Sequence, residues 1–257
     1  MNWLKKAFRK KEEASEIKPA PAPAPQRGRH PLKEDSFRKL IEIGMPIGDI
    51  LDVGAKTATY ELLRVFPDRR HLLMEPIVEW NEGMERNYSQ AGVSFEIINA
   101  AISDRDGEVR LKTTSVRSGE SITHARMASD GDKSEGMRVV PMRTLDGLVA
   151  ERTLEKPYLL KIDVDGAELS VLAGAKNTLK DCSVVVIETG IANMIERAQA
   201  VKDAGFQVFD IVDISYYDGR FVQADIVFVN EKILNERKLG VYHHGFDIKK
   251  WRNYVPA

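Results

Sequence analysis

The sequence lacks the features that mark several specialised classes of protein. It contains one cysteine among 257 residues, Cys182, so no internal disulfide can form, and no Cys and His residues have the spacing of a zinc site. No run of about 18 apolar residues occurs, so no helix could span a bilayer with its backbone hydrogen bonds satisfied. These absences favour a soluble, cytoplasmic protein whose only contact with a membrane would be peripheral.

An excess of charge of either sign is also missing. The 38 Lys and Arg residues are balanced by 39 Asp and Glu residues, which leaves a net charge of -1. Proteins that bind nucleic acids usually carry a basic excess that neutralises phosphates, so we expect no nucleic-acid partner. At 43% hydrophobic residues, a chain of this length can bury the core of one large domain, with two small domains as the less favoured alternative. Its oligomeric state cannot be inferred from the sequence.

The two ends of the chain differ from the middle. Residues 1–11 predict a short basic amphipathic helix, because apolar residues recur at helical spacing among lysines and arginines: Trp3, Leu4, Ala7 and Phe8. The Pro- and Ala-rich stretch 19–25 favours an extended linker. This segment either docks on anionic lipid or a protein partner or is a frayed helix with solvated charges. We therefore divide the chain into a tail of residues 1–35, a domain of residues 36–240 and a C-terminal tail of residues 241–257.

Within the domain, short apolar runs alternate with amphipathic stretches, which is typical of βαβ units and a mostly parallel sheet. The predicted strands are 49–53, 71–74, 94–98, 158–162, 183–187, 207–211 and 225–229, and the predicted helices are 59–66, 78–90, 168–179 and 192–204. An Asp-Gly turn at 218–219 predicts that the last two strands are antiparallel. The expected fold is therefore a doubly wound α/β, Rossmann-like sheet, mostly parallel, with an antiparallel terminal strand.

One stretch, residues 107–143, interrupts this alternation. Short strands are predicted at 108–112 and 138–142, and between them lies a polar segment that contains Arg117, Ser121, His124 and Arg126. Long loops of this kind in a compact domain are usually functional or mobile. We interpret the segment as a cap that faces the substrate, with plain mobility as the alternative.

The turn after the first predicted strand indicates a cofactor site. The predicted strand 49–53 contains Asp52 near its end and is followed by Gly54 and Ala55. Such a strand-turn-helix is where open α/β sheets bind nucleotides. It lacks the Gly-x-Gly-x-x-Gly pattern that brings a pyrophosphate against backbone N–H groups, and Asp52 would repel a phosphate. S-adenosylmethionine has no phosphate and carries a cationic amino group and a sulfonium. We therefore expect Asp52, Gly54 and Ala55 to bind S-adenosylmethionine.

Two further positions extend this predicted cofactor site. Glu75 closes the second strand about 20 residues beyond the glycine turn, where an acid can accept both ribose hydroxyls. The alternative is an ordinary exposed acid at a strand end. After the third strand, Ala101 and Ile102 offer small and apolar groups where an adenine ring would lie.

A third candidate region surrounds the fourth predicted strand. Lys161 and Asp163 share one face of this strand, because side chains alternate with period two. A lysine in a central strand needs a partner, which could be Asp163 or Glu188. Asp165 and Glu168 stand three residues apart at a helix start, as in a capping arrangement, so we assign Glu168 to structure. Asp163, at the carboxyl end of its strand, is the candidate for cofactor binding and catalysis.

At this point the chain resembles a known family. The string KIDVDGAELSVLAGA, from Lys161 to Ala175, is similar to the signature segment of FkbM-type methyltransferases. Further landmarks occur in order over about residues 50–230: DVGA from Asp52, EP from Glu75, NAAISDRDGEV from Asn99, TLDGL from Thr144, VVVIETG from Val184 and ADIVFV from Ala224. Two positions depart from the pattern, since Ala58 replaces a second glycine of the cofactor turn and Asp165 replaces the usual glutamate.

The resemblance implies a class I methyltransferase fold, S-adenosylmethionine as cofactor, and methyl transfer to a hydroxyl of a sugar, glycan or secondary metabolite. Such an alcohol must lose a proton to a general base, for which Asp163, Glu188 and His124 are the candidates. Asp163 and Glu188 could instead share a divalent metal, although two acids alone do not predict a metal site.

Three other functions compete with this interpretation. An NAD-dependent oxidoreductase is disfavoured by the missing glycines. A non-catalytic S-adenosylmethionine-binding or scaffold protein, docked through the N-terminal segment, is a second alternative. RNA methylation is a third, against which the charge balance argues.

Overall fold

The computed structural model describes residues 31–114, 122, 124–127, 137–240, 248–249 and 251. The predicted amphipathic segment 1–11 and linker 19–25 therefore lie outside the described residues, as do Arg117, Ser121 and most of the tail 241–257. Among the described residues, no helix is long and apolar enough to cross a membrane.

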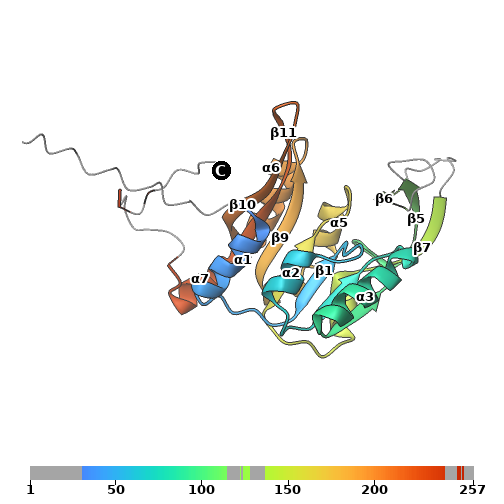
Figure 1. Ribbon diagram of the computed structural model, residues 1–257, viewed down its shortest axis with the longest axis horizontal. Helices are drawn as coiled ribbons and strands as arrows, with labels where there is room; N and C mark the ends of the chain where they lie inside the picture. Colours follow the sequence, from blue (N-terminus) through green and yellow to red (C-terminus); the bar gives the residue numbers. More distant parts are fainter. Residues whose placement is uncertain are drawn as a thin grey trace, which may run out of the picture.

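The described chain alternates between strands and helices through most of its length (Figure 1). The helices are α1 (Lys33–Glu42), α2 (Tyr60–Val65), η1 (Val78–Trp80), α3 (Asn81–Ala91), α4 (Leu145–Ala150), α5 (Glu168–Ala173), η2 (Thr178–Asp181), α6 (Met194–Asp203) and α7 (Glu231–Arg237), where η denotes a 3₁₀ helix. The strands are β1 (Ile50–Val53), β2 (His71–Met74), β3 (Phe95–Ile98), β4 (Ala101–Ile102), β5 (Gly107–Thr114), β6 (His124–Met127), β7 (Met137–Arg143), β8 (Tyr158–Ile162), β9 (Cys182–Gly190), β10 (Phe206–Tyr217) and β11 (Arg220–Asn230).

A seven-stranded sheet forms the centre of the domain, in the order β10-β11-β9-β8-β1-β2-β3. Neighbouring strands from β3 to β9 are parallel, whereas β11 is antiparallel to both β9 and β10. The predicted doubly wound α/β sheet with a reversed terminal strand is thus confirmed. Because β2 and β8 lie on opposite sides of β1, the strand order reverses at β1, which is where α/β sheets of this type open a ligand crevice.

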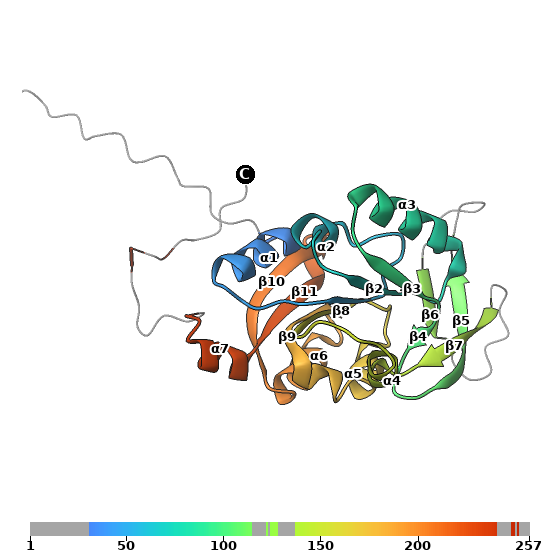
Figure 2. The ribbon, with the colours of Figure 1, turned by 90° about the horizontal axis from the view of Figure 1, so that it is seen from below.

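Helices cover both faces of this sheet, with α1, α2 and α3 on one side and α4, α5 and α6 on the other (Figure 2). On the first side, Phe37 and Leu40 of α1 pack with Ile50 of β1 and Leu159 of β8 in one fully buried cluster. Side chains alternate across the sheet, so Leu51 of β1 and Leu160 and Ile162 of β8 join the larger cluster beneath α5 and α6. The side of β1 and β8 under α1 and α2 is therefore the side that also receives Asp52 and Lys161.

A smaller sheet of four strands, in the order β4-β7-β5-β6, lies beside this core (Figure 2). Two of its strands, β5 and β7, confirm the short strands predicted at 108–112 and 138–142. The polar segment between them is not wholly a loop, because β6 pairs antiparallel with β5 through four residue pairs.

Some elements differ from the prediction. The predicted helix 168–179 is broken into α5 and η2 around Gly174, because this residue packs against the loop after β4: an added Cβ there would lie 1.9 Å from the carbonyl oxygen of Ser103. Helices α1, α4 and α7 were not predicted. The last two strands are longer than expected and form the extended β10–β11 hairpin (Figure 1).

Candidate active site

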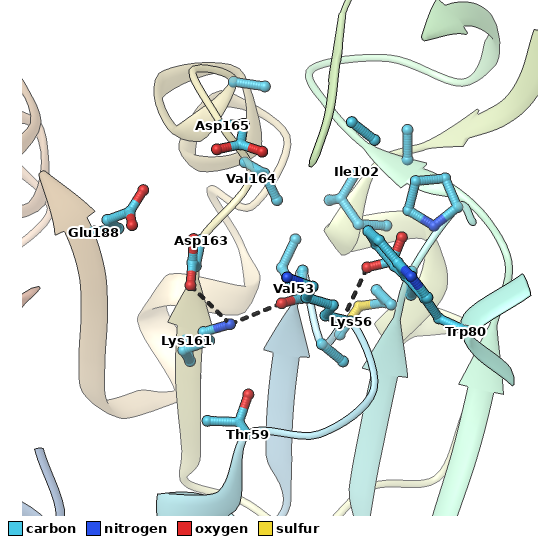
Figure 3. A pocket seen from close by; sticks show the side chains of 18 of the residues that line it. Val53, Lys56, Thr59, Trp80, Ile102, Lys161, Asp163, Val164, Asp165 and Glu188 are labelled. Atoms are coloured by element: carbon cyan, nitrogen blue, oxygen red, sulfur yellow. Dashed lines mark hydrogen bonds and ion pairs between the residues drawn. The ribbon is translucent and has the colours of Figure 1, made fainter. Parts of the chain in front are cut away.

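A cavity of about 330 Å³ opens where the carboxyl ends of β1, β2, β8 and β9 meet. Its wall is formed by the loops after β1 and β8, the end of β9, η1 and the smaller sheet (Figure 3). Ligand sites of this size, with a few converging polar groups at the switch point of a sheet, are typical of α/β proteins.

The loop after β1 is held tightly against the loop after β8. Gly54 adopts a φ of +83°, and an added Cβ would lie 1.8 Å from the carbonyl oxygen of Asp163, so only glycine fits. The Asp163 N–H donates to the carbonyl oxygen of Val53 at 3.0 Å, and the Lys161 ammonium donates to the carbonyl oxygen of Gly54 at 2.8 Å. These contacts hold the two loops together, and Gly54, Ala55 and Asp163 all line the cavity.

Glu75 lies at the cavity wall but is only 3% exposed. Its two carboxylate oxygens accept hydrogen bonds from the backbone N–H groups of Lys56 and Ile77, both at 3.0 Å. Burial raises the pKa of Glu75 to about 7, and these two hydrogen bonds partly oppose the rise. Each oxygen keeps a further lone pair, so the carboxylate is oriented by the backbone and still able to accept hydrogen bonds from a diol.

Beneath this loop lies a cluster of three charged groups, of which Lys161 and Asp52 are buried and Asp163 is partly exposed. The Lys161 ammonium, 4% exposed, is 3.3 Å from Asp52 Oδ1 and 3.4 Å from Asp163 Oδ2. Burial disfavours the ammonium, but the two carboxylates outweigh it and raise the pKa of Lys161 above its usual range. The partner of Lys161 is therefore Asp163 rather than Glu188, together with Asp52, which the sequence did not indicate for this role.

The position of Asp52 bears on its predicted role in cofactor binding. Asp52 pairs in register with Lys161 across β1 and β8, is fully buried and is not among the residues that line the cavity. Its side chain alternates onto the face beneath α1 and α2, away from the opening. A direct contact between Asp52 and a cofactor stays a prediction that this position does not favour, because Asp52 reaches the cavity only through Lys161.

Two carboxylates, Asp163 and Glu188, line the cavity on its β8 and β9 side (Figure 3). Burial alone would raise the pKa of Asp163, but the ammonium groups of Lys161 and then Lys33 hold it below its ordinary value. Burial, followed by repulsion from Asp163 and Asp225, raises the pKa of Glu188 to about 8. The two acids are thus tuned in opposite directions, Asp163 to stay ionised and Glu188 to hold or release a proton near neutral pH.

Glu168 has a structural role, but not as a cap. The N-cap of α5 is Ala167, which makes no side-chain hydrogen bond, and Asp165 lies on the cavity wall with a φ of 50°. Glu168 is fully buried, forms an ion pair with Arg197 of α6 and accepts a hydrogen bond from the Gly166 N–H at 3.2 Å. It fastens α5 to α6.

The opposite wall of the cavity is more apolar. Ala101 and Ile102 form β4, pair with β7 and line the cavity, where Trp80 and Ile102 lie across from Glu188 (Figure 3). The Lys56 ammonium lies 5.7 Å from the centroid of the Trp80 ring, within the range of a cation–π contact. Trp80 is therefore a further candidate for contact with a flat ring, and its only sequence signal was a large aromatic shortly after Glu75.

Lys33 also lines the cavity, although no sequence signal pointed to it. His124 lies in β6, but its side chain is outside the described residues, so its role as a base stays a prediction. Within the described ranges, no group of three or more His, Cys, Asp or Glu side chains could hold a metal ion.

These features fit S-adenosylmethionine. A buried carboxylate held toward the cavity suits a ribose diol, an apolar wall with an aromatic ring suits an adenine, and ionised Asp163 suits a cationic group. The strand order, the reversed β11 and this cavity define a class I methyltransferase type of cofactor-binding domain.

The comparisons give the family. The methyltransferase FkbM domain matches residues 42–213, and the chain belongs to this family, whose cofactor is S-adenosylmethionine. A relative is the hexuronic acid methyltransferase AglP of Haloferax volcanii, 23% identical over 156 residues. The match covers 61% of this chain and 62% of the relative, so the chain spans less than two thirds of that protein's length.

Solved structures with a similar arrangement include two methyltransferases. Precorrin-6y C5,15-methyltransferase from Geobacter metallireducens is 10% identical, with a TM-score of 0.44 and coverage of 80% of this chain and 94% of that one. Magnesium protoporphyrin IX methyltransferase from Synechocystis is 7% identical, with a TM-score of 0.44 and 77% coverage of each chain.

Proposed function

We propose that this protein is an S-adenosylmethionine-dependent O-methyltransferase whose acceptor is a hydroxyl of a sugar, glycan or other small molecule. The observation that carries the proposal is the cavity itself, which joins a cofactor-type wall at Gly54 and Glu75 to a second wall bearing two carboxylates, Asp163 and Glu188. The family supports methyl transfer, and the relative AglP, a hexuronic acid methyltransferase, supports a sugar acceptor. A scaffold without activity is not favoured by this family membership.

Bound S-adenosylmethionine would supply an already activated methyl group on a sulfonium. The chain must then align the acceptor oxygen with that carbon and take up its proton. Glu188 is the better base of the two, because its pKa of about 8 matches the working pH more closely than the lowered pKa of Asp163. Asp163, held ionised by Lys161, would orient the acceptor hydroxyl or stabilise nearby positive charge.

Gln223 supports this assignment geometrically. Its side-chain amide donates to Glu188 Oε1 at 2.5 Å, so this carboxylate oxygen is held in place. Gln223 comes from β11, the strand paired with the end of β9. The carboxyl group that would take the proton is therefore positioned by the central sheet rather than by the cap.

The test is methyl transfer from labelled S-adenosylmethionine to fractionated glycans and small hydroxyl compounds. In the wild type, the rate should rise with pH through about 8, because Glu188 loses its proton there. Glu188→Gln should lower turnover about 10²-fold or more and flatten this rise. The control is Glu196→Gln, an exposed position on α6, which should behave as the wild type. Labelled product that forms equally well with Glu188→Gln would remove Glu188 from the role of base.

A further inference from the structure

Outside the span of the family match lies a buried ion pair that reaches the active site. Lys33, at the start of α1, is 8% exposed, and Asp225 of β11 is 7% exposed. The Lys33 ammonium lies 2.5 Å from Asp225 Oδ2 and 3.3 Å from Asp213 Oδ2. Both Lys33 and Asp225 fall outside residues 42–213, yet Lys33 lines the same cavity as Glu188.

The sheet register brings this pair against the proposed base. Asp225 is the direct cross-strand partner of Glu188 in the antiparallel pair of β11 and β9. Directly opposite residues of such a pair project from the same face, and two like charges there are destabilising. Lys33 therefore supplies the counter-charge for Asp225 at the point where Asp225 would otherwise face Glu188 uncompensated.

The start of α1 is held in place by more than this ion pair. The Lys33 N–H donates to Asp213 Oδ1 at 3.0 Å, and the Asp213 N–H donates to the carbonyl oxygen of Pro31 at 2.8 Å. Asp213 itself has a φ of 50° at an irregularity of the β10–β11 pair. A non-glycine residue in this conformation is uncommon and is maintained only where its surroundings require it. The contacts of Asp213 thus hold the first turn of α1 against β10, where Lys33 lines the cavity.

We propose that Lys33 is a positioning residue for methyl transfer, whose ammonium neutralises Asp225 so that the facing Glu188 can release its proton and accept that of the acceptor hydroxyl. This inference rests on the proposed function of Glu188. Other acids also repel the ionised Glu188, namely Asp163, Asp165 and Glu168. Glu61 and Lys161 line the same cavity, and the Arg197 guanidinium donates to the backbone carbonyl oxygen of Glu188. Lys33 differs from them because it is the only described cation paired to the cross-strand acid.

The test measures the titration of Glu188 in the full chain without cofactor or acceptor. Carboxyl groups of glutamate are labelled with ¹³C, and the Glu188 signal is identified by its loss in Glu188→Gln. In Lys33→Met the midpoint should move upward by about one pH unit, because Asp225 then repels the ionised form of Glu188 with only Lys161 left to offset its charge. Lys33→Arg keeps the charge and should restore the wild-type midpoint. Lys33→Met combined with Asp225→Asn removes both charges and should bring the midpoint back down.

The pH profile of methyl transfer should follow the same order, with Lys33→Met displaced to higher pH. An unchanged Glu188 midpoint in Lys33→Met, together with a lower melting temperature, would overturn the proposal and leave Lys33 a purely structural residue. If the midpoints move as expected but no variant, nor the wild type, transfers methyl groups, then the proposed function fails while the electrostatic coupling stands. The two failures are therefore distinguishable.

Discussion

The two ends of the cavity are built in different ways. At the proposed cofactor end, the Gly54 N–H donates to the carbonyl oxygen of Met74, and the Glu75 carboxylate accepts from the backbone N–H groups of Lys56 and Ile77. At the proposed acceptor end, Glu188 accepts a hydrogen bond from the Gln223 side chain and faces Asp225, both from β11, and Asp225 is paired with Lys33 of α1. Backbone contacts need only the right local turn, whereas side-chain contacts need particular residues from distant segments. We expect the first end to tolerate change in its neighbours and the second end to depend on them.

Lys161 is the element that the two ends share, since it bonds to the carbonyl oxygen of Gly54 and pairs with Asp163. Lys161→Met should give the largest effect of any variant here. It leaves Asp52, which is fully buried, without a counter-charge, and the free energy of unfolding should fall by about 3–5 kcal/mol. Urea denaturation measures the loss. The matched double variant Lys161→Met with Asp52→Asn should recover most of it, and a single variant as stable as the wild type would refute the role of this buried pair.

At the proposed cofactor end, Glu75→Ala should selectively weaken cofactor binding. Loss of a charge-assisted acceptor should weaken binding of S-adenosylmethionine by about 1.5–3 kcal/mol in calorimetry. The control is Glu79→Ala, which removes an exposed acid paired with Arg138 outside the cavity wall, and it should leave the affinity unchanged. Because Glu75 also holds the N–H groups of Lys56 and Ile77, thermal unfolding is recorded alongside. Equal affinity in Glu75→Ala and the wild type would remove Glu75 from the cofactor site.

At the proposed acceptor end, Asp163→Asn should have a smaller effect. Turnover should fall about 10-fold to 10²-fold, because the charge that orients the reacting groups is lost, while cofactor affinity changes little. Stability should change by less than about 1 kcal/mol, because Lys161 keeps Asp52 and the carbonyl oxygen of Gly54, and the Asp163 side chain is 38% exposed. Single-turnover transfer and thermal unfolding separate these readouts. A large loss of stability with normal turnover would instead make Asp163 chiefly a partner of Lys161.

The differences between the expected and observed site have a common physical origin. Strand alternation, readable from the sequence, correctly placed Lys161 and Asp163 on one face, and the strand-end position of Glu75 put it at the cavity wall. The same alternation puts Asp52 on that face too. Its pairing with Lys161, however, depends on β8 lying beside β1. Without that pairing, an acid in a strand before a glycine turn looks like a ligand rather than a buried counter-ion.

The sequence alone determined the seven strands of the central sheet, the reversed last strand, the helices other than α1, α4 and α7, the single-glycine turn and the family, because each is encoded in local spacing and short motifs. The tertiary structure alone decided which distant charges meet. Lys33 reaches Asp225 and Asp213 only because α1 packs on β10 and β11, and Asp225 faces Glu188 only through the register of β11 on β9. Interactions between residues almost 200 positions apart leave no periodic signal in a single chain, since their energy depends on packing rather than on neighbours in sequence.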